Sequence, residues 1–311
     1  MKSAGEATRA KPFLKWAGGK RQLIPHLQAG LPKHLSTASD LTYVEPFIGG
    51  GAVLFWLLQA YPNIKKAVIN DLNPDLATAY HMVRDFSEAL IESLEIIQEA
   101  YFSLRSEDDR RLFFNAKRDE FNVPNSDAIA RTTLLIFLNR TCFNGLFRVN
   151  SQNKFNVPFG RYKNPRICDA RALRTNSELL QRVTILTGDF AQTLNYVDEP
   201  AFFYLDPPYK PLSKTADFNA YASENFNDAA QERLAHFCRR LDQLGHCWLL
   251  SNSDVRNTDA ENAYFDELYQ SFSIRRIKAR RAINSNANRR GEISELLVSN
   301  YRSDEVIASF A

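Results

Sequence analysis

The segment Asp206-Pro207-Pro208-Tyr209 follows the apolar run FFYL and combines an acid, two prolines and an aromatic ring. Neither proline has an amide hydrogen to donate, so a buried strand is expected to end here with a carboxylate at its tip. The Asp206 side chain and the Pro207 carbonyl can accept two hydrogens from an amino group. Two acceptors would hold a conjugated amine nearer sp3 geometry and aim its lone pair at a donor carbon, while Tyr209 stacks on the base. This chemistry requires neither a metal nor a covalent enzyme intermediate.

A second set of residues surrounds the glycine-rich stretch FIGGGAV, residues 47–53. A glycine turn between a strand and a helix lets a ligand approach the backbone and the helix N-terminus closely. Asp71 stands about 20 residues after Gly51, where dinucleotide-binding folds place the acid that accepts hydrogen bonds from a ribose diol. The two features together favour a nucleoside-containing ligand.

Five short apolar runs are expected to form the parallel strands that position these residues. They are residues 42–47, 66–71, 182–189, 201–206 and 246–252. Several alternate with helical segments, and residues 227–245 carry an N-cap at Asn227 or Asp228 and a stop at Gly245. This alternation predicts an α/β fold with a doubly wound sheet, whose ligands bind outside the carboxyl ends of the strands. The acids at these ends are expected along one edge: Glu45, Asp71, Asp189 and Asp206.

The middle of the chain has a different pattern. Residues 74–138 show mostly helical periodicity, and residues 141–166 are rich in Asn, Gly, Arg and aromatic types, as in a hairpin or an ordered loop. We therefore predict a discontinuous catalytic domain, residues 1–74 and 181–311, with an insertion at residues 75–180. The C-terminal part is expected to contain two strands joined by a polar, basic loop.

Charge is unevenly distributed although the net charge is only +3. Residues 131–182 hold ten Lys or Arg against two Asp or Glu, and residues 274–290 hold seven Lys or Arg and no acid. Two basic segments on a nearly neutral protein indicate a polyanion as partner. The four cysteines form no C-x-x-C pair, so neither a zinc site nor a disulfide framework is expected. The expected compartment is a reduced cytoplasm. No apolar run is long enough for a membrane span.

The motifs, in their order, resemble those of the DNA adenine-N6 methyltransferases of the Dam type, the D12 class or alpha group. The matching stretches are FLKWAGGKRQLIP, VEPFIGGGAVLF, NDLNPDL, DPPY, PLSKTADFNAY and RRAINSNANRRGEISELL, and the likeness covers roughly residues 11–300. The resemblance implies a Rossmann-like sheet that binds S-adenosyl-L-methionine (SAM) and an inserted target-recognition domain with a β-hairpin. It also implies methylation of the N6 amine of a flipped-out adenine in double-stranded DNA, with S-adenosyl-L-homocysteine as the second product and no metal.

The resemblance also assigns roles to residues. It places Asp206, Pro207 and Tyr209 at the target amine, with Asp206 close to the cofactor as well. The expected cofactor-binding residues are Trp16, Lys20, Glu45, Phe47, Gly49, Gly51, Asp71, Asp189 and Phe190. Base flipping is required physically, because a paired N6 cannot be reached within the stack.

The segment NRTCFNGLFRVN…KFNVPFGRY resembles the recognition hairpin of family members that bind GATC. Arg148 fits a guanine contact, because its guanidinium can bond O6 and N7 together. Phe143 and Asn144 lie where the family inserts side chains between base pairs that are opened when the base flips out. The family often has Tyr at the position of Phe143. The other expected DNA contacts are Arg140, Leu146, Lys154, Pro158, Arg161, Tyr162, Lys163, Asn286 and Arg290, with the basic side chains contacting phosphates.

Two other classes of function stay open from sequence. One is SAM-dependent methylation of another amine, such as cytosine N4, an RNA base or a protein glutamine. At the position of Asp206, cytosine-N4 enzymes tend to have Ser and glutamine enzymes Asn. The other is a non-catalytic DNA-binding scaffold. The protein is expected to act as a monomer on bacterial or phage DNA, either alone or beside a cognate restriction endonuclease encoded nearby.

Overall fold

Seven strands form one sheet in this chain. The computed structural model describes residues 9–16, 18–124, 127–209, 226–280 and 292–302. The strands are Leu41–Glu45 (β1), Ile64–Asp71 (β2), Val183–Thr187 (β3), Ala201–Leu205 (β4), Cys247–Ser253 (β5), Ser273–Arg280 (β6) and Glu292–Ser299 (β7). Their order in the sheet is β3-β2-β1-β4-β5-β7-β6. β1 pairs in parallel with β2 and β4, and β4 pairs in parallel with β5, whereas β7 is antiparallel to both β5 and β6.

All five strands expected from apolar runs are present, and their alternation with helices confirms the doubly wound α/β class. Every residue of β4 and β5 is buried. This is why their sequences are continuous apolar runs instead of alternating ones: a central strand covered on both faces has no solvent side. The two strands expected at the C-terminal end are also present, as β6 and β7.

By its backbone contacts the chain divides into two compact units, which we describe separately. The helical unit comprises residues 1–19, 49–60 and 71–188, and the sheet unit comprises residues 20–48, 61–70 and 189–311. The assignment of residues 75–180 to an inserted recognition domain stays a prediction. No helix in the described part of the chain is long and apolar enough to cross a membrane.

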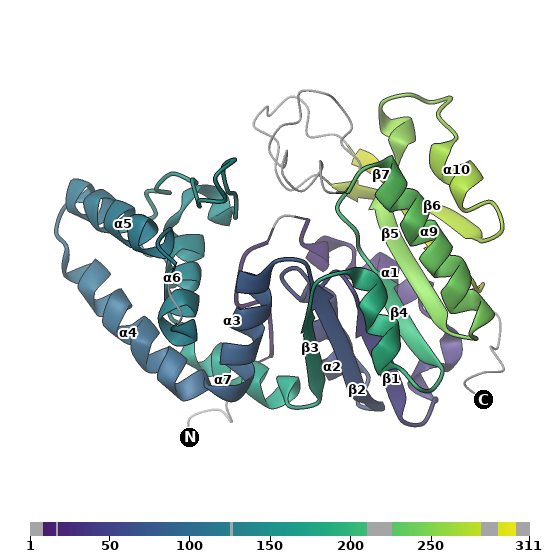
Figure 1. Cartoon of the computed structure of the whole chain (residues 1–311), viewed down its shortest axis with the longest axis horizontal. Helices are drawn as coiled ribbons and strands as arrows, with labels where there is room; N and C mark the ends of the chain where they lie inside the picture. Colours follow the sequence, from purple (N-terminus) through teal and green to yellow (C-terminus); the bar gives the residue numbers. More distant parts are fainter. Residues whose placement is uncertain (1–8, 17, 125–126, 210–225, 281–291, 303–311) are drawn as a thin grey trace, which may run out of the picture. The chain divides into compact units, whose positions relative to one another are not determined.

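The helical unit contains β3 and the helices Ala52–Ala60 (α2), Pro74–Asp85 (α3), Ser87–Ser103 (α4), Glu107–Phe121 (α5), Ala128–Thr141 (α6) and Ala170–Leu180 (α7). Helix α6 is buried along most of its length, and it packs against α3, α4 and α5 (Figure 1). A helix that is apolar on all sides belongs in the centre of a bundle. Side-chain caps at Asn73, Ser106 and Asp127 begin α3, α5 and α6.

The sheet unit contains the helices Ile24–Gly30 (α1), Asp228–Gln243 (α9) and Tyr264–Leu268 (α10), and short 3-10 turns at Lys20–Gln22, Lys33–Ser36, Phe190–Tyr196 and Val255–Asn257. Helix α9 packs against β5 (Figure 1). It begins where predicted, because the Asn227 side chain accepts a hydrogen bond from the Ala230 amide. Gly245 has a φ of +78° just after the helix, a conformation that glycine adopts without strain.

The predicted recognition hairpin is held by two isolated antiparallel bridges, Cys142 to Phe159 and Val149 to Phe155, instead of a continuous ladder. A 3-10 turn at Phe143–Gly145 separates the bridges on one side, and Asn144 within it has a φ of +55°. Pro158 interrupts the other side, because it has no amide hydrogen to donate. The segment is thus an ordered, irregular connection, one of the two forms expected from its composition.

Candidate active site

The acidic motif after β4, Asp206-Pro207-Pro208-Tyr209, is positioned by neighbouring elements of the sheet unit. β4 ends at Leu205, so the prolines stop the strand where predicted. The Pro208 carbonyl accepts a hydrogen bond of 3.4 Å from Gln231 Nε2 on α9. Gln231 is itself fully buried, and its Oε1 accepts a bond of 3.2 Å from Asn252 on β5. These contacts tie the loop to a helix and to the adjacent strand.

The Asp206 carboxylate accepts two hydrogen bonds within the sheet unit. Lys20 Nζ lies 2.8 Å from Asp206 Oδ1, and the side chains expose only 7% and 18% of their surface, respectively. Ser251 Oγ donates to the same oxygen at 3.1 Å, and Tyr204 Oη lies 2.9 Å behind Ser251 Oγ. Burial raises the pKa of Asp206 above its ordinary value, and the Lys20 charge acts in the opposite direction. The carboxylate is therefore poorly solvated but compensated by one cation.

Tyr209 completes this cluster. Its hydroxyl donates a hydrogen bond of 2.9 Å to Glu295 Oε2 on β7, and Lys20 Nζ lies 4.2 Å from the centroid of its ring. Burial raises the pKa of Tyr209 well above its ordinary value, so the hydroxyl stays protonated and can only donate to a carboxylate. A cationic nitrogen thus contacts both Asp206 and the Tyr209 ring. These are the two groups predicted to hold the amine and the plane of a base.

In the helical unit, the glycine turn is bonded to Asp71. Asp71 Oδ2 accepts from the Gly49 amide at 3.1 Å, and Oδ1 accepts from the Asn73 amide at 2.9 Å. Gly49 and Gly51 have φ values of +47° and +72°, and a Cβ at Gly51 would clash with the Tyr80 hydroxyl. Burial raises the pKa of Asp71, which these amides partly offset. Each carboxylate oxygen can accept more than one bond, so Asp71 keeps acceptor capacity beyond these amides. Its contact with a ribose stays a prediction.

Trp16 lies against the same turn. A Cβ at Gly49 would come within 3.1 Å of Trp16 Cδ1, and one at Gly50 within 3.2 Å of Trp16 Cβ. The Trp16 ring also stacks on Phe147, with centroids 5.2 Å apart. Phe147 belongs to residues 141–166, the segment predicted to recognise DNA and called the recognition segment below. The predicted cofactor contact therefore adjoins both the glycine turn and the recognition segment.

The remaining predicted cofactor residues of the sheet unit have protein partners. Phe47 packs on Phe190 with ring centroids 5.3 Å apart. Arg233 forms an ion pair of 2.6 Å with Asp189 and lies 4.6 Å from the Phe190 ring centroid. Glu45 is buried and accepts a hydrogen bond of 2.7 Å from the Tyr43 hydroxyl. Their contact with a cofactor stays a prediction.

The recognition segment presents the residues expected at base edges. Phe143 exposes 49% of its surface, which is unusual for a phenylalanine, and Asn144 beside it is exposed too. Arg148 Nε donates to Asn156 Oδ1 at 2.7 Å, and its Nη2 donates to the Asn156 carbonyl at 3.3 Å. Leu146 is half-buried and Pro158 exposed. Asn156 thus holds the guanidinium that was predicted to contact guanine.

The predicted phosphate contacts differ in their surroundings. Lys154, Arg161 and Lys163 are exposed, and Arg161 lies 3.6 Å from Glu107. Tyr162 is half-buried beneath the Lys15 ammonium, which is 5.0 Å from its ring centroid. Arg140 donates at 2.7 Å to the Phe13 carbonyl, and burial lowers its pKa. That bond gives Arg140 a structural task, and its phosphate contact stays a prediction. Asn286, Arg290 and the PLSKTADFNAY stretch lie outside the described residues.

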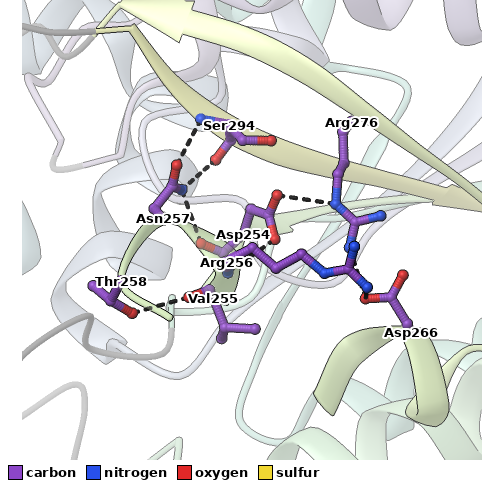
Figure 2. A network of polar contacts seen from close by, with 8 residues as sticks. All are labelled: Asp254, Val255, Arg256, Asn257, Thr258, Asp266, Arg276 and Ser294. Carbon is purple, nitrogen blue, oxygen red and sulfur yellow. Dashed lines mark hydrogen bonds and ion pairs between the residues drawn. The ribbon is translucent and has the colours of Figure 1, made fainter. Parts of the chain in front are cut away.

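Part of the basic segment at residues 274–290 is neutralised by acids. Figure 2 shows Arg276 between two of them: its Nε lies 3.1 Å from Asp254 Oδ2, and its Nη2 lies 2.6 Å from Asp266 Oδ2. Arg256 also pairs with Asp266, at 3.0 Å. Asp254 exposes only 2% of its side chain, so this network anchors β6 to the end of β5. Counting charges along the chain could not distinguish this arginine from one that contacts DNA.

Sequence reasoning missed several residues that surround the predicted ones. Ser251 and Glu295 contact Asp206 and Tyr209 from β5 and β7, and Asn156 orients Arg148. Asn139 is buried and accepts from the Lys15 amide at 2.7 Å. Leu72 is 66% exposed directly after Asp71. An apolar residue beside Asp71, the acid predicted to bind a ribose, was a signal available in the sequence. The other four residues depend on contacts between distant segments.

Comparison with known proteins identifies the family of this chain. The family model of the D12 class N6 adenine-specific DNA methyltransferases matches residues 16–283. The Type II methyltransferase M.MjaIII of Methanocaldococcus jannaschii is 47% identical over 94% of this chain and 99% of the relative. The Type II methyltransferase M1.LlaDCHI of Lactococcus lactis is 39% identical over 94% of this chain and 95% of the relative.

More distant relatives point the same way. The DNA adenine methylase of Escherichia coli is 33% identical over 92% of this chain and 94% of the relative. The family match includes residues 141–166 and the motif at 206–209, and the relatives align over more than nine tenths of the chain. The chain therefore belongs to the D12 class of N6 adenine-specific DNA methyltransferases.

Proposed function

We propose that this protein transfers a methyl group from SAM to the N6 amine of adenine in double-stranded GATC, after flipping the base out of the duplex. The observation that carries the proposal is the position of Lys20 Nζ, 2.8 Å from Asp206 Oδ1 and 4.2 Å from the Tyr209 ring centroid. An N–H donor at a carboxylate and over an aromatic face is the arrangement that the amine of a stacked base needs.

In this mechanism, Asp206 and the Pro207 carbonyl accept the two N6 hydrogens and bring the nitrogen closer to sp3 geometry. Tyr209 stacks on the flipped base and fixes its plane. SAM, when bound, supplies a methyl carbon that is electrophilic because it is attached to a sulfonium. The N6 lone pair forms the new bond as the carbon–sulfur bond breaks. The proton that N6 then releases passes to Asp206, whose pKa is raised by burial.

For the cofactor, we propose that Asp71 binds the ribose hydroxyls and that the turn at Gly49 and Gly51 passes close to the methionine portion. The positive φ values and the backbone amides of this turn support that assignment. Trp16, Lys20, Glu45, Phe47, Asp189 and Phe190 are assigned to the same cofactor on the family's motifs alone.

Methyl transfer to defined duplexes tests the whole proposal. Purified protein and labelled SAM are incubated with a GATC duplex and with duplexes that carry single-base changes of it. Label on GATC alone is expected. Label on another adenine context would keep the chemistry but refute the specificity, whereas label on cytosine N4 or on RNA would support the competing amine substrates. SAM binding without turnover on any nucleic acid would favour a non-catalytic scaffold.

Replacing Arg148 by Ala is expected to relax discrimination at one guanine of the site by about 1–3 kcal/mol, because a bidentate contact to O6 and N7 is lost. Relative kcat/KM on GATC and on single-base variants measures this. The control is Arg166→Ala, which removes an exposed arginine that pairs with Asp169. An equal loss on all sequences would make Arg148 a phosphate contact.

DNA affinity is expected to fall steeply with salt, by about 0.9 in log K per unit of log salt for each phosphate neutralised. Titration of a labelled duplex between low and physiological salt gives the slope. The double variant Lys154→Ala/Lys163→Ala should make this slope shallower by the contribution of about two phosphate contacts. A slope that is unchanged in this variant would remove both lysines from the DNA interface.

We further propose that the enzyme acts as a modification methyltransferase beside a restriction endonuclease. The two Type II methyltransferases are 47% and 39% identical to this chain, and the DNA adenine methylase of Escherichia coli is 33% identical. The higher identities favour a role beside an endonuclease over a methyltransferase that acts alone. The test is whether a nuclease encoded beside this gene cuts unmethylated GATC and spares the product of the methylation assay.

A further inference from the structure

We propose that Glu295 is a positioning residue for methyl transfer, which acts by holding the Tyr209 ring through a hydrogen bond to its hydroxyl. The bond is 2.9 Å long and joins β7 to the loop after β4. This inference rests on the proposed role of Tyr209 as the surface on which the target base stacks.

The bond restricts a motion that would disturb stacking, the displacement of the far end of the ring. Tyr209 follows two prolines, whose rings fix their φ angles and reduce the freedom of the backbone before it, so its side-chain torsions are a main source of ring movement. A hydrogen bond at the hydroxyl fixes the far end of the ring and so limits χ1 directly. The hydroxyl oxygen lies on the χ2 axis, so the bond limits that torsion less strongly. Because the acceptor is a carboxylate, the bond is of the stronger, charge-assisted kind.

Glu295 is in turn held in place by its neighbours. Ser294, the preceding residue, exchanges two hydrogen bonds with the Asn257 side chain: Asn257 Nδ2 donates to the Ser294 carbonyl at 2.6 Å, and the Ser294 amide donates to Asn257 Oδ1 at 2.9 Å (Figure 2). Asn257 Nδ2 also donates to the Asp254 carbonyl at 2.8 Å. Glu295 itself pairs with Ser253 of β5 and Ile277 of β6 in the sheet. Its backbone therefore has little freedom.

Burial makes it costly for the Glu295 carboxylate to lose its polar partners. The pKa of Glu295 is raised by burial and by the nearby Asp206, and lowered by Lys20 and by the Tyr209 hydroxyl. A half-buried acid beside a second acid costs free energy. Packing alone would favour an apolar side chain at this position, which points to a task for the carboxylate in the site.

Two substitutions separate the hydrogen bond from the charge. Glu295→Gln keeps an oxygen that can accept from Tyr209, whereas Glu295→Ala removes it. We expect single-turnover methylation of a GATC duplex, at saturating SAM and DNA, to be roughly 10- to 100-fold slower with Ala and close to wild type with Gln. The SAM dissociation constant should not change in either variant. Glu267→Gln, an exposed acid on α10, is the matched control.

A spectroscopic measurement reports on the ring itself. With 2-aminopurine in place of the target adenine, stacking on Tyr209 quenches the fluorescence of the flipped base. Glu295→Ala should give a brighter complex than wild type, and Tyr209→Phe should too, because its ring lacks the hydroxyl that is held. The double variant should be no worse than either single variant, since both remove the same bond.

The outcomes are distinct. Equal losses in Glu295→Gln and Glu295→Ala would overturn the inference, because the charge and not the bond would then matter. Additive losses of the methylation rate in Glu295→Ala/Tyr209→Phe would overturn the inference as well. So would 2-aminopurine fluorescence that is unchanged in Glu295→Ala. A wild-type protein that methylates no DNA would refute the proposed function instead.

Discussion

Replacing Asp206 by Ala is expected to lower kcat for adenine methylation by about 10³-fold or more, because both the acceptor for the amine and its alignment are lost. Binding of a GATC duplex should persist, since the recognition segment does not contain Asp206. SAM affinity should fall far less than kcat, since Asp206 is only one of several residues predicted near the cofactor. Labelled methyl transfer under single-turnover conditions measures the rate, and fluorescence titration measures the two affinities. A kcat near that of wild type would remove Asp206 from the reaction.

A loss of folding must be separated from a loss of chemistry in this variant. Lys20 exposes only 7% of its side chain, and removing its carboxylate partner leaves an ammonium poorly solvated, which costs up to about 3–5 kcal/mol when a buried pair is broken. The double variant Lys20→Met/Asp206→Ala removes that charge. It should recover thermal stability without recovering activity. Asp198→Ala, an exposed acid before β4, is the control for charge alone.

Predictions from sequence succeeded where a local rule determines the structure. Two prolines after an apolar run must end a strand, and β4 does end at Leu205. The helix ending before Gly245 was bounded correctly because an N-cap side chain and a positive φ are properties of single residues. The acidic motif and the glycine turn were found in the same way, from residue types at short spacing.

Contacts between distant segments were beyond sequence reasoning. Tyr209 and Glu295 are 86 positions apart, and their hydrogen bond depends on the order of strands in the sheet. Antiparallel pairing of β7 with β5 places Glu295 opposite Ser253. A periodic pattern predicts that a strand exists, but it carries no information on its neighbours or on the register of pairing.

Charge patterns mislead for a related physical reason. Arg276 and the exposed Lys154 contribute equally to the count of basic residues, yet Arg276 is paired with Asp254 and Asp266. A basic side chain is available to phosphates only if the fold does not give it an acid, and these acids come from other segments. The composition thus indicates a polyanion partner for the molecule without indicating which arginines contact it.

Replacing Gly51 by Ala is expected to weaken SAM binding by at least about tenfold and to lower the stability of the fold by about 1–2 kcal/mol or more. A φ of +72° costs an alanine roughly 1–2 kcal/mol. In addition, the new Cβ would clash with the Tyr80 hydroxyl and lie 3.3 Å from Phe55 Cε2, so the turn must shift. Isothermal titration with SAM measures the affinity, and thermal unfolding measures the stability.

Two comparison variants separate backbone strain from the clash. Gly245→Ala has a similar φ of +78° but nothing within 4 Å of the new Cβ, so it should lose stability by about 1 kcal/mol and bind SAM normally. Gly51→Ala/Tyr80→Phe removes the clashing hydroxyl and should recover part of the affinity, although Tyr80→Phe also loses the bond of 3.1 Å to the Gly49 carbonyl. If Gly51→Ala bound SAM as wild type does, the turn would not approach the cofactor, and the assignment of Gly49 and Gly51 would be wrong. Partial recovery in the double variant would instead locate the effect at the contact between this turn and α3.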